Sequence, residues 1–321
     1  MSAPVQVAVL ETPAGFQPNS ALVAEGVAEF LRQRLQNFRP EVAVVPARRG
    51  GPGPDGTDNP ALQGSLAGAD VLFLGPGSPT YAVRHLAGSL AWHTLTAAHR
   101  CGAHVVFASA AAVAVSQVAL PVYEIFKVGD DPHWVGGLDF LGPYGLSLAI
   151  VPHWNNTEGG RLLDTSRCFL GQERFAVLLS ILPASVGVLG LDEHTAIILD
   201  LAGGVGQVIG RGSVTVLKSG TERRFMAGES LDLCVLGDYH LPDPDQGLPP
   251  RFLDAIGATR AGGVPRSVPP AEVLALVQER QAARARSDWA TADALRTRVA
   301  ELGWSIRDTD QGPRLDPRQQ N

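Results

Sequence analysis

The sequence predicts an α/β fold: a mostly parallel sheet with helices on both faces, then a β-rich end and a small C-terminal helical hairpin. In the first half, short apolar runs alternate with segments whose apolar residues recur at helical spacing, a pattern typical of buried parallel strands joined by helices. From residue 186 onward, short apolar runs are separated by Gly and Asp, which favours hairpins. Residues 270–304 then carry two amphipathic helical patterns.

Each element follows from a local pattern. The predicted strands of the parallel part are apolar runs at residues 5–11, 41–47, 70–75, 103–108 and 146–152. Helical spacing appears at residues 19–35, 82–100 and 173–182, and Pro183 ends the last of these helices. The hairpin runs lie at residues 186–190, 195–200, 207–210, 213–218 and 230–235.

The chain is predicted to divide into three parts. Residues 1–240 form the α/β domain, and residues 241–267 are so rich in Pro and Gly that they indicate a linker. Residues 268–321 form the helical module, in which acidic and basic residues balance. A chain of 321 residues with 45% hydrophobic residues is long enough for this arrangement.

Composition excludes several classes of function. The net charge of −6 gives no general reason to expect nucleic-acid or membrane binding. Cys101, Cys168 and Cys234 lie far apart, which supports neither a zinc site nor a dithiol motif. We expect no metal and no cofactor. The N-terminus lacks a signal-peptide pattern and no apolar stretch reaches membrane-spanning length, so we expect a cytoplasmic protein.

Ser109 is the first candidate catalytic residue. It follows an apolar run and precedes a stretch of small residues, in the segment VVFASAAAVAVS at 105–116. This context suits a nucleophile elbow, a sharp turn between strand and helix that exposes a serine hydroxyl. Glycines usually flank such a serine, but Phe107 and Ala111 stand here. A small residue in a packed core is therefore the competing interpretation.

A nucleophilic serine needs a base and an orienting carboxylate. His153 lies just past a predicted strand, where α/β folds place functional loops. His194 also follows a strand and is the rival base, and Glu124 is a candidate carboxylate. Each of these residues, taken alone, is more often structural.

The loop FLGPGSPTY at residues 73–81 is a candidate anion site. Gly75 and Gly77 allow unusual backbone angles between a strand and a helix that begins near Pro79. Backbone N–H groups in such a loop can hold an anion or a developing oxyanion. The loop has neither the Lys nor the third Gly of a phosphate-binding loop.

Four segments together resemble the peptidase E/cyanophycinase family of serine hydrolases, which has the class I glutamine amidotransferase-like fold with a nucleophile elbow. They are LFLGPGSPTYAVRHL, GAHVVFASAAAVAVS, VPHW and VLGLDEHTAIILD, in that order. The resemblance covers roughly residues 1–236. It implies Ser109 as nucleophile, His153 as base and Glu124 as the acidic member of the triad.

The same resemblance implies further site residues. The oxyanion hole falls on Gly75, Pro76 and Gly77, with the N–H of Ala110 as second donor. Candidate pocket residues are Asn155, Arg174, Asp192 and Glu193, and if the acidic-peptide preference of the family holds, Arg84, Arg161 or Arg174 should bind a carboxylate. Pro76 removes one N–H donor from the loop. This departure, with Phe107 and Ala111, leaves a catalytically weak or inactive binding protein as the alternative.

The C-terminal module resembles the C-terminal helical extension of cysteinyl-tRNA synthetases. The shared pattern, R-x-x-A-R-x-x-x-D-[WF]-x-x-A-D-x-[IL]-R, lies within residues 270–315. The nucleotide-binding signatures of a synthetase are absent from the sequence, so the chain is not itself one. The resemblance implies contact with tRNA or an aminoacyl-tRNA synthetase, against the simpler interpretation of a packing hairpin.

The sequence therefore predicts a serine hydrolase that cleaves an amide or ester bond of a small peptide or amino-acid conjugate. The alternative is a ligand-binding or translation-associated protein. The substrate is not determined by the sequence, and a homo-oligomer stays open.

Overall fold

The computed structural model describes residues 4–243, 245–261, 270–309 and 312–318. Its first sheet is parallel, with the order β2-β1-β3-β4. The strands are β1 (Gln6–Leu10), β2 (Glu41–Val45), β3 (Val71–Leu74) and β4 (His104–Phe107). Side chains alternate along them, so that Val9 faces one side of the sheet while Ala8 and Leu10 face the other.

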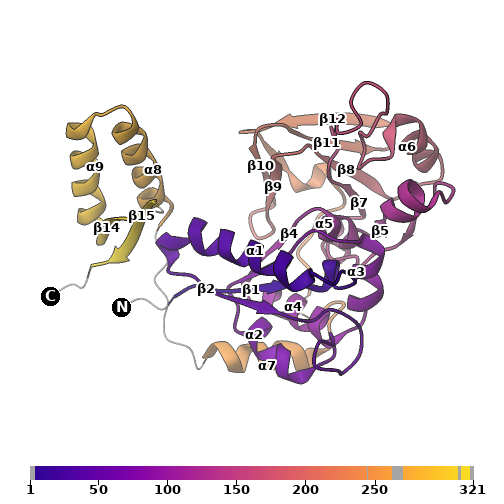
Figure 1. The fold of residues 1–321 in the computed structure, drawn as a ribbon, viewed down its shortest axis with the longest axis horizontal. Coiled ribbons are helices and arrows are strands. Elements are labelled where there is room, and N and C mark those ends of the chain that lie inside the picture. The colour runs from indigo at the N-terminus through magenta and orange to yellow at the C-terminus, as the bar shows by residue number, and fades with distance from the viewer. Residues whose placement is uncertain (1–3, 244, 262–269, 310–311, 319–321) are drawn as a thin grey trace.

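Helices cover both faces of this sheet, as the sequence predicts (Figure 1). On one face α1 (Ser20–Arg34) packs Ala24 and Ala28 against Val9. On the other face lie α2 (Pro60–Ala67) and α4 (Leu90–Arg100). The helix α3 (Pro79–Leu86) follows β3.

The prediction of a linker at residues 241–267 is partly wrong. Within residues 241–267 the chain forms α7 (Pro250–Ala261), which packs beside α2 and α4 (Figure 1). Leu248 and Ile256 are buried in the main core, and the ring of Phe252 stacks on His93 at 5.0 Å. Prolines and glycines dominate the composition here, but the few apolar residues between them suffice to anchor a helix. Residues 244 and 262–267 of the predicted linker lie outside the described residues.

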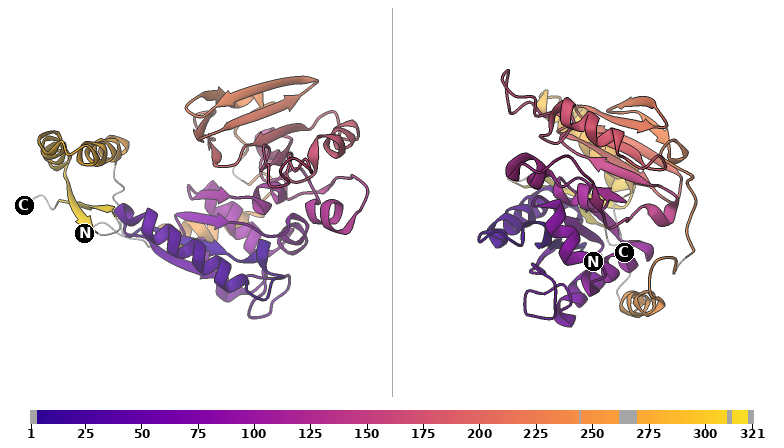
Figure 2. Two further views of the ribbon diagram at one scale, coloured as in Figure 1. Left: turned by 45° about the horizontal axis from the view of Figure 1, so that its top comes forward. Right: turned by 90° about the vertical axis from the view of Figure 1, so that its right-hand side faces the viewer.

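A second four-stranded sheet follows, with the order β12-β11-β8-β7. It comprises β7 (Leu148–Val151), β8 (Gly187–Leu191), β11 (Ser213–Lys218) and β12 (Thr221–Met226). Only the first two pair in parallel, and α6 (Gly171–Ser180) connects them. A third, antiparallel sheet of β9 (Thr195–Asp200), β10 (Val205–Gly210) and β13 (Ser230–Asp232) completes the β-rich end (Figure 2).

The elbow region connects the two four-stranded sheets. The short helix α5 (Ala110–Ala114) follows β4, and Ser116 Oγ accepts the N–H of Ile150 at 2.8 Å. The N–H of Gln117 donates to the carbonyl of Leu148 at 2.8 Å. The chain after α5 therefore lies along β7, which brings the end of β4 close to the end of β7.

The C-terminal module contains more than the predicted helical hairpin. The helices α8 (Ala271–Ala285) and α9 (Trp289–Glu301) are followed by a β-hairpin of β14 (Trp304–Thr309) and β15 (Gly312–Pro317) (Figure 1). Trp304, Ile306 and Leu315 of this hairpin are buried against Val273, Val277 and Val299 of the helices. The hairpin supplies the apolar surface that two short helices lack, so the module has its own small core. In the described part of the chain, no helix is long and apolar enough to cross a membrane.

Candidate active site

Ser109 lies in the turn between β4 and α5. Its backbone angles are φ 51° and ψ −115°, a conformation that costs a residue with a Cβ free energy and is found mainly where the surroundings enforce it. The N–H of Ala108 donates to Leu74 of the neighbouring strand, and the N–H of Val113 donates to the carbonyl of Ser109. Strand and helix thus hold the serine in a strained turn, which is the geometry of a nucleophile elbow.

His153 stands opposite this serine. Ser109 Oγ lies 3.0 Å from His153 Nε2, although 44 residues separate them in the chain. His153 follows β7 and also has a positive φ, 53°. The sequence analysis expected this serine and this histidine to meet, and the structure brings them together.

The carboxylate beside His153 is Glu193, and the expected pairing with Glu124 is wrong. Glu193 Oε1 lies 3.1 Å from His153 Nδ1. Glu124, on the π-helical turn η3 (Glu124–Val128), instead accepts a hydrogen bond from the hydroxyl of Thr80 at 2.6 Å.

Sheet topology explains why Glu193, and not Glu124, lies beside His153. The strands β7 and β8 are parallel neighbours, with Val151 opposite Gly190. His153 and Glu193 therefore both lie just past the carboxyl ends of adjacent strands, where functional groups of α/β sheets gather. The detectable sequence signal was an acidic residue directly after a strand, in the segment LGLDEHTA.

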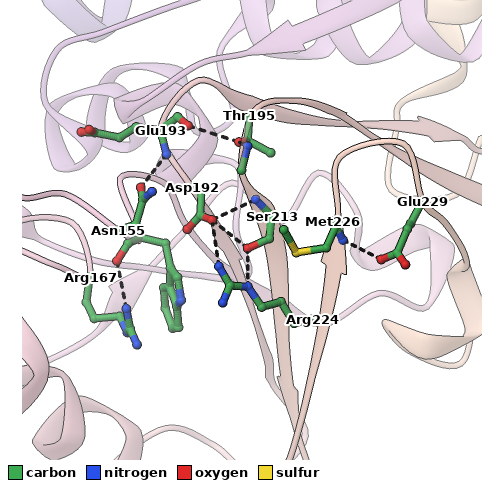
Figure 3. A network of polar contacts seen from close by, with 11 residues as sticks. Asn155, Arg167, Asp192, Glu193, Thr195, Ser213, Arg224, Met226 and Glu229 are labelled. Atoms are coloured by element: carbon green, nitrogen blue, oxygen red, sulfur yellow. Dashed lines mark hydrogen bonds and ion pairs between the residues drawn. The ribbon is translucent and has the colours of Figure 1, made fainter.

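Two asparagines fix the position of Glu193. The side-chain amide of Asn156 donates to Glu193 Oε1 at 2.7 Å. Asn155 Oδ1 accepts the backbone N–H of Glu193 at 2.8 Å, as Figure 3 shows. The hydrogen bond from Asn156, followed by that from His153, lowers the pKa of Glu193 below its ordinary value. The carboxylate beside the imidazole is thus kept ionised.

Asp192, the preceding residue, has a structural role. It is buried and accepts hydrogen bonds from the N–H and the hydroxyl of Ser213, at 2.8 and 2.7 Å. Arg224 lies 3.6 Å from the same carboxylate oxygen (Figure 3). These contacts anchor the turn that carries Glu193 to β11 and β12.

The glycine loop after β3 reaches the site through Gly77. Gly77 and Ala110 line the same cavity as Ser109, whereas Gly75 and Pro76 are not among its lining residues. Gly77 has φ +148°, and a Cβ there would come 1.8 Å from the carbonyl oxygen of Pro13. The close approach of these two backbones requires glycine at this position. The carbonyl of Gly75 accepts the N–H of Ala111 at 3.3 Å and so joins the loop to the elbow.

The two residues that replace the expected glycines point into the core. The ring of Phe107 lies 5.0 Å from that of Phe140 and 6.5 Å from that of Trp92. Ala111 is 1% exposed. Neither residue lines the cavity, so both are accommodated without blocking access to Ser109.

The cavity at Ser109 has a volume of about 430 Å³, within the usual range for small-molecule sites. One wall comes from α5 and η3 and the other from the loop after β7. The lining residues are Gly77, Pro79, Ser109, Ala110, Val113, Val122, Tyr123, Phe126, Lys127, His153, Glu158, Gly159, Leu163, Thr165, Cys168 and Phe169.

None of the four expected pocket residues lines this cavity, and Arg174 is exposed on α6. Among the residues that the structure describes, no group of three or more His, Cys, Asp or Glu side chains could hold a metal ion.

Sequence comparison identifies relatives of the C-terminal module. Residues 269–314 match the family model of the cysteinyl-tRNA ligase anticodon binding domain. The chain is 42% identical over 66 residues to a cysteine–tRNA ligase of Methanosarcina mazei and 43% identical over 68 residues to that of Streptomyces coelicolor. These alignments cover 20% and 21% of this chain, and only 13% and 11% of the two ligases.

Structure comparison identifies a solved protein whose fold is similar to that of the α/β domain. A crystal structure of a peptidase from an acI-B1 Actinobacterium matches with a TM-score of 0.56 and 21% identity, over 72% of this chain and 84% of that chain. The α/β domain therefore shares the fold of that peptidase, and the resemblance of the C-terminal module to cysteinyl-tRNA synthetases is confirmed.

Proposed function

We propose that this protein is a serine hydrolase that cleaves an amide or ester bond of a small peptide or amino-acid conjugate. The observation that carries the proposal is the hydrogen-bonded chain from Ser109 through His153 to Glu193, with distances of 3.0 and 3.1 Å. The peptidase-like fold supports the same reaction class. Phe107 and Ala111 leave the cavity open, which favours turnover over the alternative of an inactive binding protein.

The mechanism follows from the roles of these groups. His153 Nδ1–H donates to Glu193, which leaves Nε2 free to accept the proton of the Ser109 hydroxyl. Ser109 Oγ then attacks the carbonyl carbon, and the N–H groups of Gly77 and Ala110 stabilise the resulting oxyanion. His153 returns the proton to the leaving amine or alcohol. A water molecule, activated in the same way, releases the acyl group from Ser109.

Covalent labelling tests this proposal. We expect the purified protein to gain one adduct with an alkyl fluorophosphonate, seen by intact mass, and Ser109→Ala to gain none. An activated serine is required for this reaction, since an ordinary serine hydroxyl is a weak nucleophile. A wild-type protein that stays unlabelled, or a variant labelled equally, would contradict the proposal.

The match of the C-terminal module supports a second proposal, that the module binds tRNA. Trp289 is 58% exposed at the start of α9, with the guanidinium of Arg284 5.9 Å from its ring. Arg286 and Arg296 are also exposed. An exposed aromatic ring beside arginines is a typical stacking platform for unpaired bases.

We expect Trp289→Ala to weaken binding of the full chain to transcribed tRNA about 10-fold, because stacking of one base contributes about 1–3 kcal/mol. Fluorescence anisotropy at fixed salt measures the affinity for tRNA. Gln281→Ala, an exposed change on α8, serves as the matched control. Equal affinity of wild type and Trp289→Ala would overturn this proposal.

A further inference from the structure

The cavity beside Ser109 has an apolar interior. Val113, Val122 and Cys168 line it and are at most 6% exposed. Burial raises the pKa of the Cys168 thiol to about 12, so at neutral pH this side chain is an uncharged, weakly polar surface.

Aromatic rings extend this surface to the catalytic histidine. The ring of Phe169 lies 5.5 Å from that of His153, and the ring of Phe126 lies 5.9 Å from that of Phe169. Both phenylalanines line the cavity. A group attached to a carbonyl at Ser109 would therefore meet hydrocarbon on both walls.

The charges of the cavity lie on exposed side chains. Lys127 and Glu158 are its charged lining residues, and both are exposed. The Lys127 ammonium sits 4.7 Å from the centre of the Phe126 ring. None of Arg84, Arg161 and Arg174 lines the cavity. An acidic group placed among Val113, Val122 and Cys168 would lose its hydration without gaining a buried cation, which is strongly unfavourable.

We infer that the acyl group transferred to Ser109 carries an uncharged apolar side chain, branched aliphatic or aromatic. The enzyme then acts on leucyl-like or phenylalanyl-like amides and esters in preference to aspartyl ones. This inference rests on the proposed hydrolase function and names the substrate class of the same site.

Amino-acid phosphonate diphenyl esters test it directly. In their reaction a serine oxygen forms a P–O bond and phenoxide leaves, so the inactivation rate reports how well each side chain fits. We expect the leucine and phenylalanine analogues to label Ser109 at least about 10-fold faster than the aspartate analogue, since even one methylene group in an apolar pocket is worth about 10-fold or more.

Two variants connect the preference to the cavity. Phe126→Ala should reduce the advantage of the phenylalanine analogue over the aspartate analogue. Lys127→Met should leave the order of preference unchanged. A small alkyl fluorophosphonate, applied to each variant, shows that the fold and the serine are intact.

The outcomes separate the two proposals. If the fluorophosphonate labels Ser109 but the aspartate analogue reacts fastest, and Lys127→Met abolishes that advantage, the hydrolase stands and the apolar specificity is wrong. If all the analogues label Ser109 at similar rates, the apolar specificity is also wrong. If neither reagent class labels Ser109, the hydrolase proposal fails and the specificity fails with it.

Discussion

At the residue scale, unusual backbone conformations cluster around the cavity. Ser109 and His153 have φ angles of 51° and 53°, and the consecutive residues Arg167, Cys168 and Phe169 have 58°, 58° and 70°. Each such conformation costs on the order of 1–3 kcal/mol and persists only where the surroundings enforce it. Here packing and hydrogen bonds do so: the N–H of Cys168 donates to the carbonyl of His153, and Arg167 stacks on Trp154 at 3.9 Å.

The identity of the acidic residue leads to a prediction at the same scale. Glu193→Gln should lower the rate of fluorophosphonate labelling by about 10²–10⁴, because the imidazole loses the carboxylate that sets its tautomer and stabilises its charge. Glu124→Gln is the matched control, since Glu124 contacts Thr80, and it should change the rate only a few-fold. A larger loss in Glu124→Gln than in Glu193→Gln would restore the original assignment.

At the scale of elements, an ion-pair network fastens the β-hairpin of the module to its helices. Arg280 is 4% exposed and donates two hydrogen bonds to Asp308, at 2.9 and 2.8 Å, and Arg284 lies 2.6 Å from the same carboxylate. The hydrogen bonds from Arg280 hold the pKa of Asp308 at about 2. Removing the Asp308 carboxylate would leave the buried guanidinium of Arg280 without this partner, which is costly.

The direction of this pKa shift gives a pH prediction. Because the pKa of Asp308 is lower in the folded state than in the unfolded chain, where it is about 4, the ionised carboxylate stabilises the fold at pH values above about 4. This contribution is lost as the pH falls toward about 2. With Asp308 41% exposed, solvent screening reduces it to about 1–2 kcal/mol at pH 7. Asp308→Asn should therefore speed hydrogen exchange in α8 about 5- to 30-fold at pH 7 and progressively less below pH 4.

Glu279→Gln removes an exposed carboxylate from the same helix and should leave exchange in α8 nearly unchanged. An effect of Asp308→Asn that persists undiminished at pH 2, or equal effects of both variants, would contradict the assigned role of Asp308.

At the scale of the whole molecule, the two parts of the chain have separate cores. Among the residues that the structure describes, the module's buried apolar cluster lies within 273–315, and the other apolar clusters contain no residue of that range. The catalytic groups proposed here all belong to the α/β domain. The two proposed activities thus reside in parts that bury their apolar surface independently.

Removal of residues 262–321 should therefore leave the rate of fluorophosphonate labelling within about 2-fold of wild type while abolishing tRNA binding. Labelling kinetics and anisotropy on the same preparation measure both effects. A labelling rate that collapses although thermal unfolding of the α/β domain is unchanged would show that the module takes part in the reaction.

Much of the fold was predictable because it depends on local patterns. The parallel strands, the helix at 19–35 and the strand-to-helix turn at Ser109 all follow from apolar runs and small residues close together in the chain. Errors arose where packing overrode composition. The Pro- and Gly-rich segment before residue 261 still forms α7, and the hairpin that completes the module was missed.

By itself, the sequence determined the fold class, the serine elbow, the histidine that meets it, and the resemblance of the tail to a tRNA ligase module. Only the tertiary structure decided the third member of the site, because Glu193 lies 40 residues from His153 and reaches it through the pairing of β7 with β8. It likewise decided the character of the cavity, since α5, η3 and the loop after β7 contribute its walls from distant parts of the chain. Neighbouring strands and facing walls are set by long-range packing, which no local pattern encodes.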